Sequence, residues 1–79
     1  MVNKEVFEII KKYVEENGIS PSVQDIVNRS SFSSKSTALI AINELEEKGY
    51  LKTVKFENGK TISRGIILIK TEWEENETI

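Results

Sequence analysis

The chain of 79 residues has no cysteine, no histidine and a single proline. Without cysteine it forms neither disulfides nor thiolate metal sites, and without histidine it lacks the commonest general base and transition-metal ligand. It has no apolar run near the roughly 20 residues of a membrane-spanning helix, and its start lacks the features of a signal peptide. We therefore expect a cytoplasmic protein that is not an enzyme, with no metal, no organic cofactor, no membrane partner and no small-molecule ligand.

The composition is that of one small folded domain. Hydrophobic residues make up 38% and charged residues 30% of the chain, a balance typical of globular proteins. A chain this short buries only about 60–65% of its unfolded surface, so its core is thin. No repeat or linker divides it, and we expect one domain over residues 1–70 followed by an acidic, flexible tail over residues 71–79.

Charge is distributed unevenly along the chain. The net charge of the whole sequence is −2. Residues 29–70 nevertheless hold eight basic and four acidic side chains, whereas residues 1–28 and 71–79 are both acidic. Such asymmetry favours a surface that binds a polyanion, although ordinary scatter of surface charges is the alternative explanation.

Two helices are predicted before residue 30. The segment Asn3–Asn17 has apolar residues at helical spacing, Asn3 is a suitable cap, and Gly18 stands where a left-handed residue would end the helix. A second, short helix follows Ser22 and ends near Arg29. Ser22 and Asp25 have the spacing of a capping box, which marks its start.

A serine-rich turn around Phe32 leads into a third predicted helix, which Ser34 caps and which runs to Lys48. Gly49 ends it, and Tyr50 is placed to fold back as in a Schellman motif. The inward face of this helix is expected to carry Ala38, Ala41, Ile42 and Leu45.

After Gly49 the pattern changes to aromatic and β-branched residues, which is typical of strands. Asn58-Gly59 is a strong hairpin signal because both central residues of the turn must accept positive φ. A two-residue turn there predicts Leu51 opposite Ile66, Thr53 opposite Arg64 and Lys55 opposite Ile62. Gly65 is expected to mark a bulge or a close backbone approach.

Three helices followed by a hairpin predict an α+β fold, a three-helix winged helix-turn-helix with a C-terminal two-stranded β-hairpin wing. In this fold the second helix lies across the DNA backbone, and the start of the third enters the major groove. The leading hypothesis is therefore a sequence-specific binder of double-stranded DNA that regulates transcription.

The candidate base-reading residues lie on the outer face of the third predicted helix: Ser34, Lys35, Ser36, Thr37, Leu39, Ile40 and Asn43. Hydroxyls and helix-terminal N–H groups contact phosphates or base edges, and Asn43 offers paired hydrogen bonds to adenine. Capping already explains Ser34, and Ser36 fits an ordinary surface position equally well. Leu39 and Ile40 are apolar where solvent is expected. They fit contact with thymine methyls, a protein interface, or a slightly rotated helix that places one of them in the core.

The candidate phosphate contacts are Ser22, at the start of the second predicted helix, and Lys55, Lys60 and Arg64 on the predicted hairpin. Basic residues on a wing typically contact the DNA backbone. The alternative is a solvated strand face, on which lysine also protects an exposed edge from pairing.

Several segments together resemble the N-terminal DNA-binding domain of the LexA family of SOS-response repressors. The resemblance covers roughly Val6 to Leu68 and rests on Val6–Ile10, Gly18–Ile26, Ser34–Thr37, Leu45–Leu51 and Ser63–Ile66, of which the last is the most specific. It implies that Ser34, Ser36, Thr37, Leu39 and Ile40 read an operator. The family usually has polar residues in place of Leu39 and Ile40, and an apolar residue and glycine in place of Ser30 and Ser31. The operator sequence is therefore expected to differ.

The resemblance leaves the wider protein open. LexA carries a second domain that dimerises and cleaves itself with a Ser/Lys dyad, and no protease activity is expected of these 79 residues, whether they are excised or stand alone. A single small module binds DNA weakly, so a homodimer or a partner protein is expected to supply affinity.

The rival hypothesis is a winged-helix protein–protein interaction module without DNA binding. It draws on the pI of about 5.2, on Leu39 and Ile40, and on the acidic segment around Trp73. Packing of Trp73 against the first helix is the alternative explanation for that segment.

Overall fold

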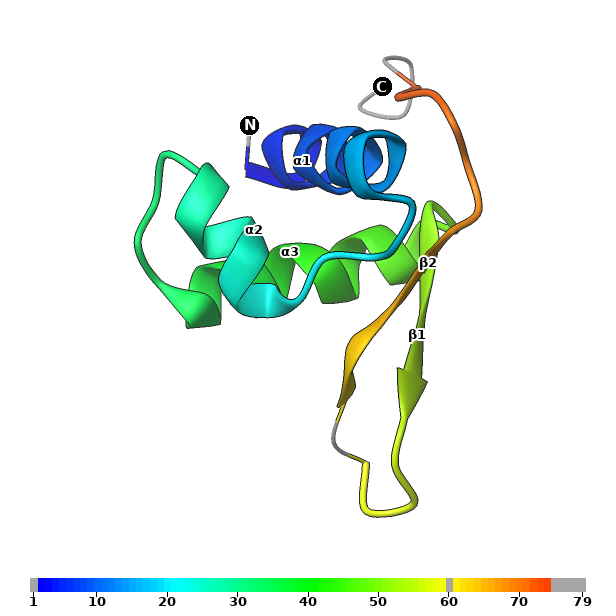
Figure 1. The fold of residues 1–79 in the computed structure, drawn as a ribbon. Helices are drawn as coiled ribbons and strands as arrows, with labels where there is room; N and C mark the ends of the chain where they lie inside the picture. The colour runs from blue at the N-terminus through cyan, green and yellow to red at the C-terminus, as the bar shows by residue number, and fades with distance from the viewer. Residues whose placement is uncertain (1, 60, 75–79) are drawn as a thin grey trace.

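The computed structural model describes residues 2–59 and 61–74. Three helices come first, α1 (Val2–Asn17), α2 (Val23–Arg29) and α3 (Lys35–Glu47). An antiparallel hairpin of β1 (Leu51–Lys55) and β2 (Thr61–Leu68) follows. The hairpin extends away from α1 beyond the end of α3 (Figure 1), and this arrangement confirms the predicted α+β winged helix-turn-helix.

The predicted cap of the first helix is wrong. Helix α1 begins at Val2, so Asn3 lies inside it. The Asn3 side-chain amide instead donates a hydrogen bond of 2.7 Å to Glu44 Oε1, which joins α1 to α3. At the other end Gly18 has a φ of 72° and donates its N–H to the Val14 carbonyl at 2.8 Å, as predicted.

The capping box of α2 is confirmed in both directions. The Ser22 hydroxyl oxygen accepts the Asp25 N–H at 3.1 Å, and the Ser22 N–H donates to Asp25 Oδ2 at 3.0 Å. Buried Pro21 precedes the box and fixes the direction of the chain as it enters the helix. The sequence thus predicts both ends of α2 correctly.

The limits of α3 are also confirmed. Ser34 has extended backbone angles and accepts the Thr37 N–H at 3.4 Å. At the other end Tyr50 N–H donates to Leu45 O at 2.9 Å, and Gly49 N–H donates to Glu46 O at 3.0 Å. Gly49 has a φ of 84°, so these are the two bonds of a Schellman motif.

The core lies between α1, α2, α3 and the base of the hairpin. It contains the whole predicted inner face of α3 and residues from every other element: Val6, Phe7, Ile10, Ile26, Ala38, Ala41, Ile42, Leu45, Tyr50, Leu51 and Ile66. Phe7 and Tyr50 pack with tilted rings whose centroids are 5.2 Å apart. The core is therefore small but continuous.

Trp73 returns to this core from beyond the hairpin. Its ring stacks on Tyr50 with centroids 4.8 Å apart and lies 5.8 Å from Phe7. The Glu74 N–H donates to the Tyr50 hydroxyl at 3.0 Å. The expected packing of Trp73 against the first helix is confirmed through Phe7, while residues 75–79 of the predicted flexible tail lie outside the described residues.

The predicted hairpin register is wrong. Leu51 pairs with Leu68, Thr53 with Ile66 and Lys55 with Thr61. Gly59 N–H donates to Phe56 O at 2.9 Å, which centres the turn on Glu57-Asn58, with Gly59 following at a φ of 87°. This turn starts one residue earlier than expected, and a bulge between Thr53 and Lys55 moves the pairing in the opposite direction, toward later residues of β2.

The bulge confirms the expectation for Gly65. A Cβ atom on Gly65 would lie 2.9 Å from the Ile62 carbonyl oxygen and 3.1 Å from that of Val54. Such distances are too short for any side chain, so only glycine fits the backbone approach at this point.

Candidate nucleic-acid interface

The predicted base-reading residues share the outer face of α3. Ser34, Lys35, Ser36 and Asn43 are exposed, and Thr37 is half-buried at the edge of the face. Leu39 is 41% and Ile40 60% exposed, so neither belongs to the core, and the rotated-helix alternative is excluded. The structure therefore brings polar groups and two apolar side chains together on one helix surface.

A cavity of about 300 Å³ lies where α2, α3 and the hairpin meet. Its lining includes three of the predicted site residues together with apolar neighbours: Pro21, Ser22, Val23, Gln24, Lys35, Ile62, Arg64 and Ile66. Ser22, Lys35 and Arg64 are thus gathered from distant parts of the chain. The first turns of α2 and α3 both begin at its edge.

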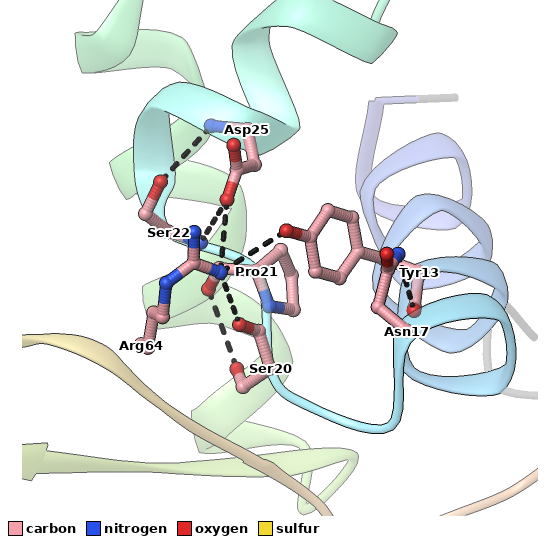
Figure 2. Close-up of polar contacts among 7 residues, drawn as sticks. All are labelled: Tyr13, Asn17, Ser20, Pro21, Ser22, Asp25 and Arg64. Atoms are coloured by element: carbon pink, nitrogen blue, oxygen red, sulfur yellow. Dashed lines mark hydrogen bonds and ion pairs between the residues drawn. The ribbon is translucent and has the colours of Figure 1, made fainter.

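Arg64 is directed toward the helices by a set of polar contacts (Figure 2). Its Nη1 donates to the Ser20 carbonyl at 2.9 Å and to the Tyr13 hydroxyl at 3.1 Å. The same nitrogen lies 3.1 Å from Asp25 Oδ2. The hydrogen bond with Tyr13 and the carboxylate of Asp25 raise the pKa of Arg64 above its ordinary value.

Asp25 takes part in both the capping box and the ion pair with Arg64. The hydrogen bond from the Ser22 backbone N–H is the main reason why the pKa of Asp25 lies below its ordinary value, and the charge of Arg64 adds to it. Asp25 therefore stays ionised at neutral pH and stabilises the start of α2.

Glu46 connects the end of α3 to β1. Its carboxylate accepts the Thr53 N–H at 3.0 Å and the Thr53 hydroxyl at 3.0 and 3.1 Å. The backbone hydrogen bond from Thr53 is the main cause of a lowered Glu46 pKa. Lys55 Nζ lies 4.0 Å from Glu46 Oε1, so this predicted phosphate contact has an acidic neighbour. Lys60 lies outside the described residues.

The serine-rich turn before α3 is fastened to α1. The Ser31 N–H and hydroxyl donate to the Glu5 carboxylate at 2.7 and 2.9 Å. The Ser30 hydroxyl lies 2.6 Å from the Phe32 carbonyl and 2.9 Å from the Val27 carbonyl. These two departures from the LexA pattern therefore serve to hold the turn.

Sequence reasoning missed Tyr13, Asp25 and Glu46 as contributors to the interface. The Tyr13–Arg64 contact joins residues 51 apart in the chain, which no local pattern indicates. Thr53 is seven residues from Glu46, across the turn that ends α3. Glu46 lies in the last turn of α3, near the negative end of the helix dipole, where an acidic side chain is unfavourable. Its position there was the sequence feature that could have indicated a partner beyond the helix.

A short helix α2, an exposed first half of α3 and a hairpin beside it define the winged helix-turn-helix class of DNA-binding domains. Residues 2–61 match the family model of the LexA DNA-binding domain. The chain belongs to the LexA DNA-binding domain family, a family of regulators and not of enzymes.

Curated relatives agree over most of the chain. The chain is 35% identical over 66 residues to the LexA repressor of Desulfatibacillum aliphaticivorans, which covers 84% of this chain and 30% of the relative. It is 36% identical over 70 residues to the LexA repressor of Petrotoga mobilis, which covers 89% of this chain and 31% of the relative. The chain thus spans about a third of the length of these relatives.

Over residues 2–59 and 61–74 there is no helix long and apolar enough to cross a membrane. The same part of the chain has no group of three acidic side chains placed to hold a metal ion.

Proposed function

We propose that this domain binds double-stranded DNA in a sequence-specific manner and serves a LexA-like transcriptional repressor in the cytoplasm, with no catalytic activity of its own. The observation that carries this proposal is the outer face of α3, where exposed polar side chains and the apolar Leu39 and Ile40 lie opposite a buried inner face. In winged helix-turn-helix domains the first half of this helix enters the major groove.

Base recognition is assigned to side chains that match base edges. The Asn43 amide both donates and accepts, which suits the paired donor and acceptor of adenine. Thr37 offers a hydroxyl and a methyl group near the start of the helix. Leu39 and Ile40 offer apolar contact to thymine methyl groups, which accounts for their exposure on a helix otherwise well packed.

Phosphate binding is assigned to the cavity edge and the wing. Ser22 and Lys35 lie at the cavity beside the first turns of α2 and α3, where N–H groups also favour phosphate. On β1 the exposed Lys55 is assigned the same role, and Lys60 remains a candidate from the sequence alone. Such contacts supply affinity for any sequence, and each phosphate neutralised by a lysine steepens the fall of log K with log salt concentration by about 0.9.

Two copies on two half-sites, or a partner protein, are proposed to complete the affinity. A single module of this size buries roughly 600–1,000 Å² on DNA, too little for tight binding alone. Two-fold symmetric operators are the usual way in which helix-turn-helix proteins overcome this limit.

The test is a titration of isotope-labelled protein with a duplex selected from a random library, followed by amide shifts in NMR spectra. We expect salt-sensitive shifts concentrated at residues 34–43 and on the hairpin. Lys35→Ala is expected to weaken binding to selected and scrambled duplexes alike, whereas Thr37→Ala and Asn43→Ala alter the preferred sequence. Equal effects of all three variants on both duplexes would contradict the assignment of base reading to α3.

Failure to select any duplex, together with no shifts at low salt, would overturn DNA binding altogether. Exposed Leu39 and Ile40 would then direct attention to a protein partner. Self-association measured by sedimentation, reduced by changing these two residues, is the result expected for that second function.

A further inference from the structure

Arg64 has an uncommon backbone conformation. Its φ is 61°, and among residues 2–59 and 61–74 it is the one residue other than glycine with a positive φ. Long side chains avoid this region because Cβ approaches the carbonyl oxygen, and such conformations persist where surrounding contacts hold them. The residue lies within the bulge of the hairpin, next to the close backbone approach at Gly65.

This conformation directs the guanidinium away from the hairpin and onto the helices. It reaches the Tyr13 hydroxyl on α1, the Ser20 carbonyl between α1 and α2, and the Asp25 carboxylate on α2 (Figure 2). All three acceptors lie within 3.1 Å of one guanidinium nitrogen, Nη1, whose two N–H groups have fixed directions in the plane of the group. Arg64 thereby attaches β2 to the elements that precede α3.

The other strand has an attachment of its own. Glu46, at the end of α3, holds both the N–H and the hydroxyl of Thr53 on β1. One attachment would leave the outer part of the hairpin to pivot about it, whereas two attachments to different helices fix its direction. The Arg64 and Glu46 contacts therefore form a pair on the two strands of the wing.

We propose that Arg64 is a positioning residue that fixes the direction of the wing relative to α3 by binding Tyr13, Ser20 and Asp25, and that it is not itself a ligand of phosphate. This inference rests on the proposed DNA-binding function. The wing cations contact phosphates only if the hairpin points along the backbone while α3 occupies the groove. The sequence-based assignment of Arg64 to phosphate is thereby replaced by an indirect role.

A phosphate-binding role and a positioning role for Arg64 predict opposite effects on DNA binding when the charge of Asp25 is removed. If Arg64 bound a phosphate, Asp25 would compete for it, and removal of the carboxylate charge would leave DNA binding unchanged or tighter. If Arg64 positions the wing through Asp25, loss of that charge loosens the wing and weakens binding. Asp25→Asn is a suitable change because asparagine retains an oxygen that can accept the Ser22 N–H.

The first measurement uses the full chain without DNA. Residual dipolar couplings of backbone amides report the direction and order of the hairpin relative to the helices. We expect Arg64→Asn and Asp25→Asn to change the couplings of β1 and β2, while those of α1 and α3 stay as in the wild type. Asparagine is chosen at position 64 because it tolerates a positive φ. Lys52→Ala is the matched control, since it removes an exposed wing cation and leaves the Arg64 contacts intact.

The second measurement is affinity for a selected duplex as a function of salt. Asp25→Asn and Arg64→Asn are each expected to weaken affinity for the duplex by at least about fivefold. This is the lower limit of the change in affinity that typically arises when one site acts on another at a distance. The double variant should be no weaker than either single one. Arg64→Lys keeps the charge but not the planar donors, so it should resemble Arg64→Asn in both measurements.

Unchanged hairpin couplings in Arg64→Asn would overturn the inference. The inference would also be overturned if Arg64→Asn lost affinity for DNA while either Asp25→Asn or Arg64→Lys kept the wild-type affinity. That pattern identifies a direct contact between Arg64 and a phosphate. If the wild type binds no duplex, the proposed function fails, and the couplings still decide whether Arg64 sets the direction of the wing. Wild-type couplings of α1 and α3 in each variant establish that the helices remain folded.

Discussion

The two faces of α3 differ in what their side chains contact. On the inner face Ala38 and Leu45 have no exposed surface and Ile42 has only 3%, and the small alanine lets neighbouring helices approach closely. On the outer face Leu39 is 41% and Ile40 60% exposed. The fold depends on the first set and not on the second. Stability and DNA binding are therefore expected to respond to separate substitutions on one helix.

The largest effect is expected from the inner face. Leu45→Ala removes a fully buried side chain next to Tyr50 and should lower the free energy of unfolding by about 2–5 kcal/mol. Urea denaturation monitored by circular dichroism measures this change. Glu47→Ala, at an exposed position two residues further along, is the control and should change stability by no more than about 0.5 kcal/mol. Similar losses in both variants would contradict the division into two faces.

The next largest effect is expected on DNA binding, from a substitution on the outer face of α3. Asn43→Ala should cost about 1–3 kcal/mol of discrimination for adenine at one operator position, because a paired hydrogen bond to the base is lost. Its melting temperature should match that of the wild type, since Asn43 is exposed. Competition between the selected duplex and single-base variants measures the discrimination. A uniform loss across all duplexes would assign Asn43 to the backbone instead.

Glu46 lies between the two faces and connects α3 to the wing. Hydrogen bonds from Thr53 hold the pKa of Glu46 below its ordinary value of 4.5. Its contribution to stability is therefore present above that value and is lost as the pH falls through the lowered pKa of the folded state.

Replacement of Glu46 by glutamine should lower stability by about 1 kcal/mol at pH 7, the usual size of a partly exposed contact of this kind. As the pH falls through the lowered pKa of Glu46, the difference from the wild type should shrink because the wild-type carboxylate is protonated. Denaturation at a series of pH values measures this convergence. Glu47→Gln is the control, and a parallel loss in that variant would count against the Thr53 contact.

The same comparison explains how much could be predicted from the sequence. The inner face of α3, its Ser34 cap and its Schellman end were predicted correctly because each depends on residues close together in the sequence. The outer face was predicted by elimination, as the surface that the core does not use. Local periodicity and capping therefore suffice to place α3 and to orient its two faces.

The wing was predicted less well because its geometry depends on distant contacts. The Asn-Gly signal located the hairpin but not its register, since the turn centres on Glu57-Asn58 and the bulge adds residues to β2. The positive φ of Arg64 contradicts its intrinsic preference and is held by Tyr13 and Asp25. No spacing rule connects residues so far apart.

A small effect on stability is expected for Ile40, which is more exposed than Leu39, the other apolar side chain of the outer face. Ile40→Ala should change the free energy of unfolding by less than about 0.5 kcal/mol, because little buried surface is lost. If Ile40 contacts a thymine methyl, this variant should bind uracil- and thymine-containing operators equally well, whereas the wild type prefers thymine at one position. Sedimentation of both proteins without DNA completes the comparison. A change in self-association with no change in the thymine preference would assign Ile40 to a protein interface rather than to the major groove.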